Sequence, residues 1–448
     1  MTLARSMLHP LSPVAAQATS HAVNFLSQLA LLHAYGAEVY GELGLGLLVV
    51  ATLTFLGELG LPTFLLRQAA SDTTWPKTWR IAVFHRLLAI TLMTVVAFLC
   101  WGLWWGFERP GVQLLLTAAP GLLLSACNLA PILYGLNNPR RAALASHVRW
   151  TAYGIFTALI AIMTPPDKAA PLLGLAVSAG WIAQHILLRS APGMPTDLSP
   201  NRGRLQSDIR QGAISLTSIG ILALLHGRAL PFLLAAQAPT LLAPCLLSLQ
   251  ILQGLSSLFG QTDRVLLPTM LKTSDTRQQL APLRLLIHAT GITTSLLILG
   301  TVAWSFAYPG SLEKLGGWMI LEWSLTQLGF AGYLGVVAQR RERTMLVRHG
   351  ILLLLLLCLQ AFAFAFPPPT ELLLAGRALA AAALMGIALA PLTSAPFSSL
   401  FRTGALVCLT CLSALWLPVA ITLTIAVVGS FWEALNLRRS AQTVGIAG

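Results

Sequence analysis

Charged residues are scarce in this chain of 448 residues: they make up only 10% of it, and the mean hydropathy is +0.75. Soluble proteins carry about a quarter charged residues, because their surface faces water. A soluble globular fold is therefore excluded. The chain instead contains long apolar runs, and many have the roughly 20 residues that a helix needs to cross a bilayer core.

Acidic residues are the rarest charged group, with 15 Asp and Glu against 28 Lys and Arg. The carboxylates are scattered, and the sequence has no phosphate-cradling Gly-Lys motif and no metal-like spacing of His and Cys. The six cysteines lie mostly inside apolar runs, and we interpret Cys408 and Cys411 as packing or lipid-facing residues. We expect no enzyme activity, no cofactor and no bound metal.

Most Lys and Arg residues lie in every second gap between apolar runs, whereas the intervening gaps hold only Arg109, Lys168 and Lys314. Cytoplasmic loops retain Lys and Arg, so the alternation predicts that both termini are cytoplasmic. The net charge of +13 is spread over short loops, none of which can fold into a nucleic-acid-binding module. We therefore expect anionic membrane lipids as partners and no nucleic acid.

The apolar runs predict an all-α polytopic membrane protein with about fourteen transmembrane helices. A polar, proline-containing stretch at 190–208 separates two groups of six helices. We predict an N-terminal six-helix lobe at 1–205, a C-terminal six-helix lobe at 206–395, and an additional helix pair with a cytoplasmic tail at 396–448. The expected helices cover 14–35, 42–66, 81–106, 112–136, 142–163, 169–189, 210–234, 237–259, 284–307, 315–338, 349–366, 370–392, 402–416 and 418–436.

Prolines inside these expected helices predict bends, because proline removes a backbone hydrogen bond. Bends suit a protein that opens alternately to the two sides of a membrane, although membrane helices also tolerate proline for no such purpose. The residues concerned are Pro62, Pro120, Pro131, Pro231 and Pro244.

A polar stripe runs along the first expected helix, with spacing i, i+4, i+7 and i+11 that places its members on one face. Exposure of such a stripe to lipid costs free energy, so the stripe either lines a water-filled cavity or forms hydrogen bonds to neighbouring helices. We favour the cavity and substrate contact for its four members, Gln17, His21, Asn24 and Gln28. For a shorter stripe of Gln250, Gln253 and Ser257 the two interpretations stay equal.

Three charges fall inside expected helices of the second half, namely Arg228, Glu322 and Arg377. Each is six or seven residues from the outer end of its helix, which places all three roughly 10 Å below the outer surface. The arginines either bind an anionic headgroup in a cavity, or reach the interface or pair with Glu322. We name Arg228 and Arg377 as candidate headgroup-binding residues.

Glu58 lies in the inner half of the second expected helix and is, with Glu322, a candidate site for a coupling proton or sodium ion. Its alternative role is an ion pair with Arg67 or Arg86. We place His288 at the membrane interface, because it lies near the inner end of its helix.

The segment 24–67 resembles the opening two helices of polysaccharide (Wzx-type) flippases of the multidrug/oligosaccharidyl-lipid/polysaccharide (MOP) superfamily. The first of these helices ends in Gly36, Glu38, Tyr40 and Gly41 here, and the second ends in Glu58, Leu59, Gly60, Leu61 and Arg67. Weaker resemblances lie at Asn137, Arg140 and Arg141, and at 254–285. One departure is Gly227-Arg228, where family members often carry an acidic residue.

The resemblance implies transfer of a polyprenyl-diphosphate-linked oligosaccharide, such as an undecaprenyl diphosphate conjugate, from the inner to the outer leaflet of the inner membrane. It implies a role in cell-surface polysaccharide biosynthesis, and the departure at Arg228 puts cation coupling in question. Two alternatives stay open: a drug or metabolite antiporter of the related multidrug extrusion family, and a membrane polymerase or ligase of lipid-linked glycans. An antiporter needs buried acids in its cavity, and the short outer loops speak against a polymerase.

Overall fold

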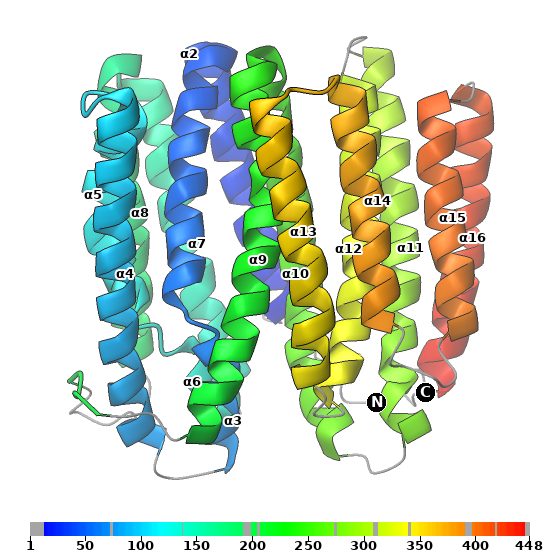
Figure 1. The fold of residues 1–448 in the computed structure, drawn as a ribbon, viewed down its shortest axis with the longest axis horizontal. Helices are drawn as coiled ribbons and strands as arrows, with labels where there is room; N and C mark the ends of the chain where they lie inside the picture. The colour runs from blue at the N-terminus through cyan, green and yellow to red at the C-terminus, as the bar shows by residue number, and fades with distance from the viewer. Residues whose placement is uncertain are drawn as a thin grey trace. The chain divides into compact units, whose positions relative to one another are not determined.

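The computed structural model describes residues 13–71, 75–136, 138–190, 199–203, 207–272, 276–307, 312–338, 342–389, 397–416 and 419–443. These residues form long helices joined by short turns and contain no strand (Figure 1). Six helices among them combine the length and hydropathy that a membrane span needs. The chain is a multi-pass membrane protein, as its hydropathy predicts.

The predicted set of 14 transmembrane helices is confirmed. The first span and most of the second are joined into α2, and the second span ends in the separate helix α3. The fourth span is broken into α5 and α6. The first ten elements are α2 (Pro13–Gly57), α3 (Leu61–Ser71), α4 (Trp75–Trp105), α5 (Pro110–Ser125), α6 (Ala130–Gly135), α7 (Pro139–Met163), α8 (Pro166–Arg189), α9 (Ser207–Gln237), η1 (Pro239–Leu241) and α10 (Leu242–Lys272). The others are α11 (Thr276–Ala307), α12 (Leu312–Ala338), α13 (Glu342–Ala365), α14 (Thr370–Leu389), α15 (Phe397–Trp416) and α16 (Val419–Thr443).

The chain forms two compact units, one within His9–Leu247 and the other containing Ser248–Gly448. In the first, α2 packs against α7, and α5 packs against α8. In the second, α11 packs against α16, and α12 packs against α14. The predicted three-part division at 205 and 395 stays a prediction.

Small residues bring α5 and α8 into close contact. A Cβ added to Gly174 would lie 2.1 Å from Oγ1 of Thr117 and 2.3 Å from the carbonyl oxygen of Leu114. The Ser178 hydroxyl accepts a hydrogen bond from the backbone N–H of Gly121 at 3.0 Å. Inside a membrane the hydrophobic effect does not drive helices together. Small residues such as these let two backbones approach closely, and the resulting van der Waals contacts stabilise the helix pair.

Glycine and proline residues set the breaks in the spans. Gly36 has φ 79° and ψ 172°, a conformation essentially restricted to glycine, and it kinks α2 where a gap between two helices was expected. Gly60 has φ 63° between α2 and α3, within the helix predicted for 42–66. Pro62 and Pro131 each lie at the start of the short helix that follows a break, where a missing N–H costs nothing.

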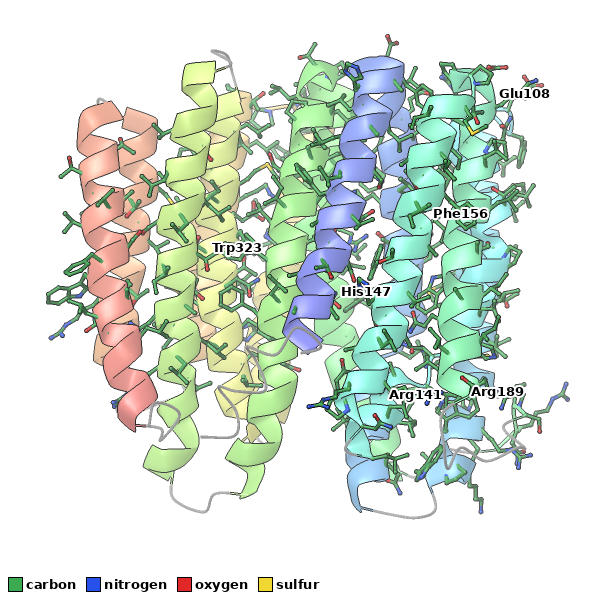
Figure 2. The ribbon with its side chains drawn as sticks, turned by 180° about the vertical axis from the view of Figure 1, so that it is seen from behind. Glu108, Arg141, His147, Phe156, Arg189 and Trp323 are labelled. Atoms are coloured by element: carbon green, nitrogen blue, oxygen red, sulfur yellow. The ribbon has the colours of Figure 1, made fainter. Side chains whose placement is uncertain are left out.

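The ends of the first unit differ in charge (Figure 2). Arg141 and Arg189 lie at one end of its helices, and Glu108 lies at the other. Arg141 donates from Nη2 to the carbonyl oxygen of Ser190 at 2.5 Å, which satisfies the C-terminus of α8. Arg80 donates from Nε to the carbonyl oxygen of Ser199 at 2.8 Å and so holds part of the polar connecting stretch at the basic end.

Candidate functional site

The polar stripe of α2 faces α7. Gln17 donates from Nε2 to Nε2 of His21 at 2.8 Å, and the His21 ring lies 5.9 Å from that of Trp150. Gln28 is fully buried and donates to the Tyr153 hydroxyl at 3.1 Å. Asn24, between them, is 9% exposed. In the described arrangement His21 and Gln28 of the stripe contact α7, and the role of the stripe in binding substrate stays a prediction.

Arg228 lies on α9 and contacts the second half of α2. Its Nη1 donates to the carbonyl oxygen of Leu48 at 2.8 Å and to the Thr52 hydroxyl at 2.9 Å. Among the described residues, no carboxylate pairs with it and no bond engages Nε or Nη2. The guanidinium is thus anchored at one corner and keeps donors for another acceptor.

Arg377 and Glu322 form an ion pair between α14 and α12 in the second unit. Nε of Arg377 donates to Oε2 of Glu322 at 3.0 Å, and Nη2 donates to Oε1 at 2.6 Å. The two side chains are 3% and 15% exposed. The pairing alternative for these residues is therefore present in the structure. Arg228 belongs to the first unit, so the expected common layer of all three charges stays a prediction.

Glu58 lies at the break between α2 and α3, close enough to Arg86 and Arg149 for its charge to act on both. Arg86 is 1% exposed and donates from Nη2 at 3.0 Å to the carbonyl oxygen of Ser125 at the C-terminus of α5, which also accepts from the backbone N–H of Asn128. The side chain of Arg67, the other expected partner of Glu58, lies outside the described residues.

Two sets of contacts were missed from the sequence. The guanidinium carbon of Arg149 lies 4.1 Å from the ring centroid of Trp181 and 4.6 Å from that of Trp150. His288 is 5% exposed and binds Glu433, a partner that was not expected from the sequence. Tryptophan near Arg149 was a signal in the sequence, whereas residues 288 and 433 are too far apart in the chain for any local pattern.

The fold of these helices is shared with solved structures of other membrane proteins. No protein-family model matches the chain, and no curated protein matches its sequence. Among solved structures, Lipid II flippase MurJ in its inward closed conformation matches with a TM-score of 0.57 and 13% identity, over 95% of this chain and 98% of that one.

Two structures of MATE match equally fully. The complex with MaD3S gives a TM-score of 0.54 at 11% identity, and the bent conformation gives 0.53 at 14%; each match covers 99% of both chains. At these identities the likeness shows the fold. The Wzx-type family and the superfamily that the 24–67 segment resembles stay predictions.

Proposed function

We propose that the chain is a flippase that moves a polyprenyl-diphosphate-linked oligosaccharide from the inner to the outer leaflet of the cytoplasmic membrane, for cell-surface polysaccharide synthesis. The observation that carries this proposal is Arg228. An arginine within a membrane helix costs free energy, up to about 2.5–3.5 kcal/mol at the helix centre on insertion scales, and Arg228 has no carboxylate partner among the described residues. Its remaining N–H donors match phosphate oxygens in geometry and charge.

The substrate chemistry fits a protein of this fold. Sugars and a diphosphate do not cross hydrocarbon unaided, whereas a polyprenyl tail remains in the bilayer. Expelling an anion from a cell with a negative interior gains about 2.3 kcal/mol per charge per 100 mV, so the membrane potential itself can drive transfer of such a lipid. The fold shared with a lipid II flippase supports the same class of substrate.

The MATE matches support the antiporter alternative. The surroundings of the two candidate ion-coupling acids, Glu322 and Glu58, support it less. Glu322 is bound by Arg377, and Glu58 is close to Arg86 and Arg149. A carboxylate that already has an arginine nearby attracts a further cation weakly. We therefore place headgroup binding at Arg228, ahead of ion coupling at Glu58 or Glu322, and we propose no enzymatic role.

The test is flipping in proteoliposomes that contain a fluorescent polyprenyl-diphosphate oligosaccharide. The outer-leaflet sugar is measured with a glycosidase that cannot cross the membrane. We expect Arg228→Ala to slow flipping at least about tenfold, the loss of one charge-assisted hydrogen bond of roughly 1.5 kcal/mol. Arg109→Ala is the matched control, because Arg109 is 57% exposed and pairs with Glu42 at a helix end.

If Arg228→Ala flips the lipid at the wild-type rate, Arg228 does not bind the substrate headgroup. Export of a cationic drug against a proton gradient, with no flipping by the wild-type chain, would favour the antiporter. In cells, deletion is expected to leave the lipid-linked oligosaccharide on the inner leaflet.

A further inference from the structure

Three helices of the second unit meet at a buried carboxylate. Glu433 on α16 accepts a hydrogen bond from Nδ1 of His288 on α11, with Nδ1 and Oε2 2.5 Å apart. Its other oxygen, Oε1, accepts a bond from the Thr403 hydroxyl on α15 at 2.9 Å. The His288 and Glu433 side chains are 6% and 1% exposed, and Thr403 is fully buried. The last helix pair is therefore joined to α11 through one acid and one base.

A glycine on α11 makes room for this contact. A Cβ added to Gly291 would lie 2.9 Å from both Cγ of Glu433 and Cγ2 of Thr403, and 3.1 Å from Cδ of Glu433. Gly291 follows His288 by nearly one helical turn, so the imidazole and the gap that receives the carboxylate lie on the same face of α11. All three helices, α11, α15 and α16, therefore contribute a residue that the contact requires.

The number of protons on the pair sets its net charge. With an imidazolium and a carboxylate the pair is neutral. Loss of one proton from Nε2 to water leaves a neutral imidazole, whose Nδ1–H still donates to Glu433, and a site with one net negative charge. Buried net charge in a low-dielectric interior is costly, whereas the same charge is well solvated once water enters.

The other titratable side chains described on the helices packed around this pair do not form a second buried pair of a histidine and an acid. On α12, Glu322 is engaged by Arg377. Arg284 lies one turn before His288 on α11, and Arg402 is exposed at the start of α15. The remaining titratable side chains described on α12, α15 and α16 are Tyr333, Cys408 and Cys411, and the two cysteines are free thiols.

We propose that His288 and Glu433 form a proton-binding site that controls how tightly α15 and α16 pack on α11. The bound proton stabilises the packed arrangement, because it makes the buried pair neutral. Its release favours separation of the helix pair and entry of water. By linkage, separation of the helices releases the proton. The inference goes beyond the proposed flipping of a lipid, and its test uses no substrate, so either can fail without the other.

The first measurement is infrared spectroscopy of the full-length chain in lipid, cycled between pH 5 and pH 9. Glu433→Gln and His288→Gln remove a charge and keep hydrogen-bonding groups of similar length. Glu322→Gln is the matched control, because it removes another intramembrane acid of the same unit. We expect a reversible imidazolium and carboxylate signal in the wild type and in Glu322→Gln, and its loss in the other two variants.

The second measurement uses native Cys411 on α15 as a reporter of packing. Cys411 is fully buried, whereas Cys358 on α13 is exposed and serves as the reference thiol. Labelling with a membrane-permeant maleimide is followed by mass spectrometry as the ratio of Cys411 to Cys358. From pH 6 to pH 9 we expect this ratio to rise at least about threefold more in the wild type than in Glu433→Gln.

Both measurements can overturn the proposal. An infrared signal that is absent in the wild type, or unchanged in Glu433→Gln and His288→Gln, means that the pair does not exchange a proton in this range. A Cys411 ratio with the same pH dependence in the wild type and in Glu433→Gln means that the pair is a fixed structural contact. Folding of each variant is checked by size-exclusion chromatography. If a Gln variant does not fold, Thr403→Val, which keeps both titrating groups, must retain the infrared signal for the proposal to stand.

Discussion

Arg377 on α14 binds Glu322 on α12 through two parallel hydrogen bonds, of 3.0 Å from Nε to Oε2 and 2.6 Å from Nη2 to Oε1. This paired geometry fixes the orientation of both side chains and leaves no net charge on the pair. Arg377 is only 3% exposed, so removing its partner would leave a buried charge with less compensation. The two residues therefore act on stability as a unit.

We expect Arg377→Leu and Glu322→Leu each to destabilise the chain by about 3–5 kcal/mol, because each leaves one buried charge without its partner. The double variant Arg377→Leu/Glu322→Leu is expected to be close to the wild type in stability, since both charges leave together. Thermal unfolding in detergent checks this through a double-variant cycle. Additive losses would show that the pair is not coupled. Flipping by the stable double variant then separates a structural pair from a substrate contact.

Gly36 provides a test of backbone strain. Gly36→Ala is expected to destabilise the chain by about 1–3 kcal/mol, because φ 79° and ψ 172° suit only glycine, although a Cβ there would meet no atom within 4 Å. Gly350→Ala in α13 is the matched control, since it also has open space around its Cβ but no positive φ. We expect the control to be neutral or stabilised by about 0.5–1 kcal/mol in thermal unfolding. Equal effects at the two positions would contradict the role of the kink.

The sequence predicted the number and order of the membrane helices because bilayer thickness and loop charge act locally. It did not predict the form of the connections. Gly36 was expected to end a helix, but its neighbours continue helically on both sides, so α2 kinks instead of stopping. The break at Gly60 was missed because the apolar run continues through it, and hydropathy does not report backbone conformation.

The candidate site was predicted residue by residue but not in its pairings. Spacing placed Gln17 to Gln28 on one face of a helix, yet could not say that this face meets Tyr153 of α7. Depth placed Glu322 and Arg377 in one layer and left their pairing as one of two interpretations; the structure brings the two side chains into contact. The pair of His288 and Glu433 was missed, since tertiary packing alone brings together residues so distant in the chain.

The contact between Gln28 and Tyr153 tests whether the polar stripe serves packing or substrate binding. Tyr153→Phe removes the acceptor of the Gln28 amide, and Oε1 of Gln28 already lacks a hydrogen-bond partner. We expect a loss of about 1–3 kcal/mol in thermal unfolding, and recovery of most of it in Gln28→Leu/Tyr153→Phe, where the Gln28 amide is removed together with its acceptor. If the recovered double variant flips lipid at the wild-type rate, the stripe at Gln28 serves packing. A stable double variant that does not flip would assign it to the transport path.

A substitution at Thr52 tests the hydrogen bond that anchors Arg228 without changing the charge of the guanidinium. Thr52→Val removes the hydroxyl that accepts from Nη1 at 2.9 Å and leaves the bond to the Leu48 carbonyl oxygen, so the guanidinium stays in place with one partner fewer. We expect a stability loss of about 0.5–1.5 kcal/mol and flipping within about threefold of the wild type, because a neutral hydrogen bond contributes modestly.

Arg228→Lys keeps the charge but not the planar fork, and we expect its flipping rate to lie between those of the wild type and Arg228→Ala. Proteoliposome flipping measured on the three variants gives the order. If Thr52→Val abolished flipping while Arg228→Lys kept the wild-type rate, the hydroxyl itself would be the substrate contact, and the guanidinium would serve only to hold α9 against α2.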